Sequence, residues 1–138
     1  ALAAEGFRRF LAVQKAAMAE APADPMSQLQ AAGLGYVRFA GASPALFRLI
    51  FSSDRPDFAN PELSVASNDS YHMLQRQVKE ATGRDPAADP EALSELQGVW
   101  AIAHGLADLL AAGRLKTLSA LPVKEREAQI LRIIGRVL

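Results

Sequence analysis

The stretch from Asp89 to Gly113 constrains the fold most, because it predicts one long helix that is apolar on two faces. Asp89 can cap the first turn, Pro90 suits the first helical position, and Gly113 can adopt the left-handed conformation that often ends a helix. Two sets of apolar residues recur at helical spacing between these signals, namely Leu93, Leu96, Trp100, Ala103, Ala107 and Leu110, and then Val99, Ile102, Leu106 and Leu109. Such a helix must be covered on both sides. We therefore expect one face in the core of this chain and the other against a second surface.

Comparable start and stop signals divide the rest of the chain into further helices. We expect these at residues 1–20, 24–40, 44–51, 60–82 and 122–138, with turns or loops at 21–23, 41–43, 52–58, 84–88 and 114–121. No segment alternates apolar and polar residues over the length of a strand. The sequence therefore predicts an all-α domain of about six helices.

Composition narrows the classes of protein to which the chain could belong. Its 138 residues fit one domain, and with half of them hydrophobic and 22% charged the chain should fold. There is no cysteine, which excludes disulfides and thiolate chemistry and fits a reducing compartment, so we expect a cytoplasmic protein. A net charge of zero attracts neither nucleic acid nor a membrane, and no apolar run is long enough to span one. The chain begins within a helical pattern and without Met, so we expect it to be part of a longer protein.

Catalytic motifs and metal-binding motifs are missing from the sequence. The two histidines, His72 and His104, do not form a pair at ligand spacing, and no serine lies in a GxSxG or SxxK motif. The glycines at positions 33, 35 and 41 lie in or at the end of a predicted helix rather than in a phosphate-binding loop. We therefore expect no enzyme activity, no metal and no cofactor.

Several bulky or polar-tipped side chains lie on helices that could converge. The candidates for lining a ligand cavity are Tyr36, Phe39, Phe47, Met73, Trp100 and His104, with small residues near them that leave space between backbones. Ligand pockets are mostly apolar with a few placed polar groups, which this set could supply. The alternative is that the same side chains simply fill the core.

Three blocks of the sequence resemble a known family. Residues 100–105 (WAIAHG) resemble the Trp-His-Gly signature of a C-terminal domain found in tetracycline-repressor-like (TetR) transcriptional regulators. Residues 35–40 (GYVRFA) and 43–51 (SPALFRLIF) resemble a second block of that domain, and residues 1–7 (ALAAEGF) resemble the helix that follows the DNA-binding helix-turn-helix. The three blocks occur in the expected order.

The resemblance implies that residues 1–138 are an effector-binding and dimerisation domain. Regulators of this family bind DNA as homodimers through an N-terminal helix-turn-helix domain, which we expect to lie outside this chain, and repression is relieved by a small apolar or amphipathic effector. The last two long helices of each subunit would form a four-helix interface that includes Gly98, Ala101, Ile102, Gly105, Leu109, Ile130, Ile134 and Val137. The alternative function is a helical interaction module that dimerises around a packed core and binds no ligand.

Overall fold

The computed structural model describes residues 2–52 and 61–138, with the backbone alone for Ser52 and residues 61–64. Within these residues every regular element is a helix. The elements are α1 (Leu2–Glu20), α2 (Pro25–Ala42), α3 (Pro44–Phe47), the π-helical turn η1 (Arg48–Ser52), α4 (Pro61–Thr82), α5 (Pro90–Ala111), α6 (Lys116–Ala120) and α7 (Val123–Gly135). The prediction of an all-α fold is confirmed.

The ends of the longer helices follow from the residues at them. The Asp24 carboxylate accepts a hydrogen bond from the Ser27 amide at 3.0 Å, which caps α2. Asp89 caps α5 in the same way, accepting from the amides of Glu91 and Ala92 at 2.9 and 3.3 Å. Helices α4 and α5 are followed by Gly83 and Gly113, whose φ angles of +77° and +71° favour glycine.

Two short elements differ from the prediction. Helix α6 lies within residues 114–121, where we expected only a connection, and it begins without a side-chain cap, so the sequence carries no start signal for it. The short apolar helix predicted at residues 44–51 is split into α3 and η1, and η1 continues through Ser52, the first residue of the predicted loop. The rest of that loop, and the predicted start at Asn60, lie outside the described residues.

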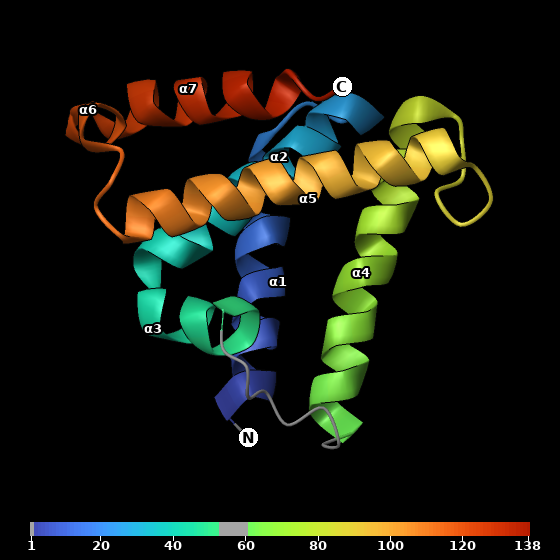
Figure 1. Ribbon diagram of the computed structural model, residues 1–138, viewed down its shortest axis with the longest axis horizontal. Helices are drawn as coiled ribbons and strands as arrows, with labels where there is room; N and C mark the ends of the chain where they lie inside the picture. Colours follow the sequence, from blue (N-terminus) through green and yellow to red (C-terminus); the bar gives the residue numbers. More distant parts are fainter. Residues whose placement is uncertain (1, 53–60) are drawn as a thin grey trace.

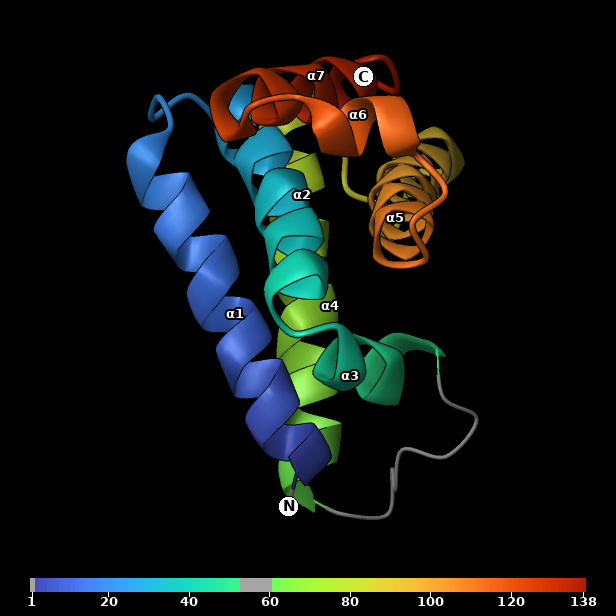
Figure 2. The ribbon, with the colours of Figure 1, turned by 90° about the vertical axis from the view of Figure 1, so that its left-hand side faces the viewer.

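The helices form two layers around α2. Figures 1 and 2 show α1, α2 and α4 side by side with α5 crossing them, and α7 packs along α2 from Gln30 to Arg38. Helices α1 and α2 approach so closely that a Cβ atom on Gly35 would lie 2.6 Å from the Cα atom of Gln14. Only glycine permits this contact, because the obstructing atom belongs to the backbone.

Both apolar and charged contacts hold helix α7 on α2. Ile134 packs against Gly33, where an added Cβ would lie 2.9 Å from the Ile134 Cδ1 atom. Arg38 donates from Nε and Nη2 to the two Glu127 carboxylate oxygens at 2.6 Å each, and from Nη1 to Glu20 at 3.1 Å. These hydrogen bonds lower the pKa of the Glu127 carboxyl below its ordinary value of 4.5.

Helix α5 buries one broad face in this chain, and that face takes residues from both predicted sets. Its buried residues are Ala92, Leu96, Val99, Ala103, Leu106 and Ala107, which include members of both predicted sets. Trp100, assigned to the first set, is 41% exposed, and Leu109 of the second is 38% exposed. The reason is that an inward face about 100° wide takes neighbours from both sets and leaves the flanks at the surface.

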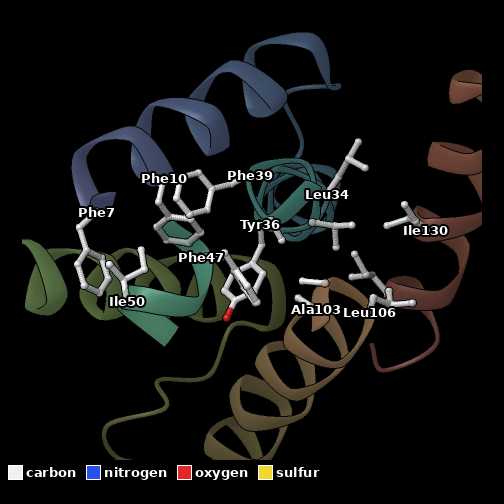
Figure 3. Close-up of a cluster of buried hydrophobic side chains, with 14 of the residues drawn as sticks. Phe7, Phe10, Leu34, Tyr36, Phe39, Phe47, Ile50, Ala103, Leu106 and Ile130 are labelled. Atoms are coloured by element: carbon white, nitrogen blue, oxygen red, sulfur yellow. The ribbon is translucent and has the colours of Figure 1, made fainter. Parts of the chain in front are cut away.

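The buried side chains form two separate clusters. The larger contains Phe7, Phe10, Tyr36, Phe39, Phe47 and Ile50 together with residues of α5 and α7. Figure 3 shows its aromatic part, in which side chains from α1, α2 and α3 lie together. The smaller contains Leu29, Val78, Leu96 and Val99. Among the described residues no helix is both long enough and apolar enough to cross a membrane.

Candidate ligand-binding site

A cavity of about 450 Å³ lies between α1, α2, η1, α4 and α5. Its lining residues are Phe7, Phe10, Gln14, Leu29, Ala32, Gly33, Tyr36, Ile50, Phe51, Ser67, Asn68, Ser70, Tyr71, Met73, Leu74, Gln77, Val99, Trp100 and Ala103. The volume is in the range of pockets that hold small molecules, and most of the lining is apolar.

The cavity adjoins both core clusters and explains why they are separate. Phe10, Tyr36 and Ala103 belong to the larger cluster, and Leu29 and Val99 belong to the smaller. All five also line the cavity. The interior of this domain therefore has two packed regions with a hollow between them, whereas an ordinary core is packed at nearly crystalline density.

Two glutamine residues that line the cavity each have a buried amide oxygen. Gln14 is 6% exposed and donates from Nε2 to the Ala32 carbonyl oxygen at 3.0 Å. Gln77 donates from Nε2 to the Met18 sulfur atom at 2.9 Å. The Oε1 atoms of both side chains are buried and have no hydrogen-bond partner among the described residues.

Tyr36 connects the cavity to the outer side of α5. Its hydroxyl oxygen lies 2.7 Å from Nδ1 of the half-buried His104. Burial raises the pKa of the Tyr36 phenol well above its ordinary value of 10.0, and hydrogen bonding from the Trp100 side chain lowers it by less. The phenol therefore stays protonated and can donate. His104 in turn lines a shallow hollow with Phe51, Gln97, Trp100 and Ala101.

Three of the six side chains expected at a ligand site line the cavity, and these are Tyr36, Met73 and Trp100. His104 does not line the cavity but lies within hydrogen-bonding distance of the Tyr36 hydroxyl group. Phe39 and Phe47 are 1% and 0% exposed, belong to the larger core cluster and do not line the cavity.

The sequence reasoning did not select Gln14 or Gln77 as site residues. Gln14 carried a usable signal, because it is the polar exception on the apolar face of the first helix. A buried amide at such a position needs partners, which a cavity or a neighbouring backbone must provide. Gln77 has polar neighbours along α4 and carried no such signal.

The residues expected at the dimer interface fall into two groups. Ala101 is exposed, Leu109 is 38% exposed and Ile102 is half-buried, and Gly105 has open space where a Cβ would lie. The remaining four take part in contacts within the chain. Ile130 and Ile134 are 2% and 0% exposed, and Gly98 faces Val137, whose Cγ1 atom would lie 2.9 Å from an added Cβ.

Comparison with protein-family models matches residues 29–133 to the family described as "Tetracyclin repressor-like, C-terminal domain". The chain belongs to this family. The match runs from α2 into α7 and includes most of the cavity wall as well as the Trp100–Gly105 block that first suggested the resemblance. Searches of curated proteins and of solved structures found no match.

Membership gives the domain a general role. Tetracycline-repressor-like C-terminal domains are regulatory domains that generally dimerise, bind small-molecule effectors and are non-enzymatic. In the described part of the chain, no three His, Cys, Asp or Glu side chains gather where they could hold a metal ion.

Proposed function

We propose that this chain is the effector-binding and dimerisation domain of a TetR-like repressor, and that an effector in the cavity controls DNA binding by an N-terminal helix-turn-helix domain. The observation that carries the proposal is the cavity between the two core clusters. An interaction module that binds no ligand would gain stability by closing this space, because voids in a core forfeit packing energy. A hollow of this size in a domain of this family is best explained by a ligand.

The arrangement of the helices supports a route from the cavity to the DNA-binding domain. Helix α1 lines the cavity with Phe7, Phe10 and Gln14, and its first residues resemble the segment that follows the helix-turn-helix. Helix α5 lines it with Val99, Trp100 and Ala103 and carries exposed small residues on its outer side. An effector that binds one arrangement of α1 and α5 more tightly than another would shift the distance between the two DNA-binding domains of a dimer.

Two substitutions on α5 test whether the space is available to a ligand. Ala103 and Ala107 lie about one turn apart and are 3% and 0% exposed, but only Ala103 lines the cavity. The ring of an Ala103→Phe variant would enter the cavity, so the free energy of unfolding should stay within about 1 kcal/mol of the wild type. The ring of an Ala107→Phe variant would enter packed core and should cost about 3 kcal/mol or prevent folding. Urea denaturation measures both free energies of unfolding. If the two variants lost equal amounts, the space beside Ala103 would not be open to a ligand.

Ligand binding is tested on the same variant with dihydroxynaphthalene, a neutral aromatic compound that the cavity could hold. Saturating compound should raise the melting temperature of the wild type, since a ligand at a hundred times its Kd stabilises the fold by about 2.7 kcal/mol. The increase should be lost in Ala103→Phe, whose ring occupies the same space. An increase of the same size in the variant would place the compound elsewhere.

A further inference from the structure

The wall that α4 contributes to the cavity changes from polar to apolar along the helix. In chain order its lining residues are Ser67, Asn68, Ser70, Tyr71, Met73, Leu74 and Gln77. The first three are short and polar, and the next three are large and mostly apolar. Resting on the proposed function, we propose that Ser67, Asn68 and Ser70 form a subsite for an uncharged hydrogen-bonding group of the effector, whose apolar body lies deeper in the cavity.

Helical spacing puts both serines on the inward face of α4. Ser67, Ser70 and Leu74 are three and four residues apart, so they share one face of the helix. Leu74 packs against the smaller core cluster, and Val78, one turn further along, is 0% exposed. A helix that packs against a filled core carries apolar residues at its inward positions. Serines at two of these positions therefore indicate that the space beside them takes water or a polar group of a ligand.

The polar side chains of the subsite are available to a ligand. No hydrogen bond to another described residue engages the side chains of Ser67, Asn68 and Ser70. The two serines are half-buried and Asn68 is exposed. Neither serine hydroxyl is among the unpaired side-chain atoms that are buried from solvent, so water or a ligand can reach both. The amide oxygens of Gln14 and Gln77 differ in this respect, because both are buried.

Deeper in the cavity the wall is aromatic and aliphatic. Six of the described lining residues are aromatic, namely Phe7, Phe10, Tyr36, Phe51, Tyr71 and Trp100. Phe10 and Phe51 pack with their ring centroids 5.0 Å apart. Leu29 and Val99, which belong to the smaller core cluster, also line the cavity. The body of an effector would remove its apolar surface from water against these side chains.

The group bound at the subsite should carry no charge. None of the described residues that line the cavity is Asp, Glu, Lys, Arg or His. A carboxylate or ammonium group that leaves water needs an opposite charge nearby, and this wall provides none. Asp69 is a neighbour in the sequence, but it is exposed and does not line the cavity. Serine hydroxyls and the asparagine amide both donate and accept hydrogen bonds, so they suit a hydroxyl, amide or carbonyl group.

The test removes the polar groups of the protein and of the ligand separately and together. Naphthamide carries an uncharged amide on an aromatic body, and isopropylnaphthalene replaces the amide by an apolar group of similar shape. In a variant with both Ser67→Ala and Ser70→Ala, naphthamide should bind about fivefold more weakly, which is the scale of one net hydrogen bond. The affinity for isopropylnaphthalene should not fall, because it makes no hydrogen bond to the serines. Equilibrium dialysis, with each compound measured by its own fluorescence, gives the affinities.

Ser94→Ala is the control for the two serine substitutions. Ser94 is an exposed serine on α5 and does not line the cavity, so this variant should keep the wild-type affinity for both compounds. Alanine favours a helix more than serine does, so the variants should fold, and circular dichroism checks this.

Naphthoate tests the requirement for an uncharged group. It has nearly the shape of naphthamide but carries a negative charge, and this cavity wall offers that charge no partner. We expect naphthoate to bind the wild-type chain about tenfold more weakly than naphthamide, because its carboxylate loses water without gaining an opposite charge.

The outcomes separate this inference from the proposed function. Equal weakening of naphthamide and isopropylnaphthalene by the serine substitutions, or no change in either affinity, would overturn the subsite while leaving a ligand-binding cavity. Tighter binding of naphthoate than of naphthamide would overturn the requirement for an uncharged group. If none of the three compounds bound the wild-type chain, the proposed function itself would be contradicted.

Discussion

Trp100 shows how one residue can serve a site and contribute little to the core. It belongs to the sequence block that resembles the family signature, and a fully buried Trp there would be costly to remove. In the structure it is 41% exposed, lines the cavity and lies with its ring centroid 6.2 Å from that of Tyr71. Much of its surface therefore faces the cavity or solvent rather than packed atoms.

We predict that Trp100→Ala lowers the free energy of unfolding by less than about 2 kcal/mol, below the ~3–5 kcal/mol typical of a fully buried aromatic residue. Phe39→Ala provides the comparison, because Phe39 is 1% exposed and packs with its ring centroid 5.6 Å from that of Phe10. That variant should lose the full ~3–5 kcal/mol. Urea denaturation of both variants measures the difference, and equal losses would show that Trp100 belongs to the core.

Single residues of the cavity wall were predictable only in part. Helical spacing and side-chain size selected Tyr36 and Phe39 together, three positions apart on α2. Tyr36 reaches the cavity, whereas Phe39 packs against α1. The difference depends on where α4 lies, because α4 completes the wall of the cavity. That placement is a tertiary contact, and the period of one helix carries no information about it.

At the scale of elements, the sequence predicts helices better than it predicts their partners. The Asp-Pro pairs at residues 24–25 and 89–90 identify two helix starts because capping is local chemistry. The inward face of α7 depends instead on Gly33, which leaves room for Ile134 beside α2. We expected Ile130 and Ile134 at a dimer interface, and the structure places both in the core of their own subunit. We therefore expect the dimer interface to be formed by exposed residues of α5 and α7.

The contact between α2 and α7 should depend on pH. Arg38 lowers the pKa of the Glu127 carboxyl, so the pair stabilises the fold above about pH 4.5 and loses its effect as the pH falls through the lowered value. At neutral pH we predict that Glu127→Gln lowers the free energy of unfolding by about 2 kcal/mol, the scale of hydrogen bonds between charged groups. The difference from the wild type should shrink in acid, where Glu127 itself becomes protonated.

Glu5→Gln is the control for this pH series. Glu5 pairs with Arg8 and Arg9 on the surface of α1 at 3.0 and 3.2 Å, and its side chain is 42% exposed. Solvent screens these pairs and they join no two helices, so the substitution should change stability little at neutral pH. Chemical denaturation at several pH values measures both variants. A pH-independent loss in Glu127→Gln would mean that the side chain acts through its shape and not its charge.

For the whole molecule, folding leaves two small residues and one leucine accessible on one outer side of α5. Ala101 is exposed, Gly105 has open space at its Cα atom, and Leu109 is 38% exposed. Small residues let two helix backbones approach closely, and they are spaced here so that they share one side of the helix. A two-fold axis through this surface would bring α5 and α7 of each subunit into a four-helix contact, burying on the order of 1,600 Å².

We predict that the wild-type chain is a dimer in solution and that Ala101→Arg converts it into a folded monomer. The substitution adds a long charged side chain at an exposed position, so the subunit fold should survive, whereas two copies facing each other across an axis would bury unpaired charges. The control is Val65→Arg, because Val65 is 59% exposed on α4, away from the proposed interface. Light scattering over a dilution series gives the mass of each variant, and circular dichroism confirms the fold. A monomeric wild type would leave the outer side of α5 for a different partner, and a dimeric Ala101→Arg variant would move the interface to another surface.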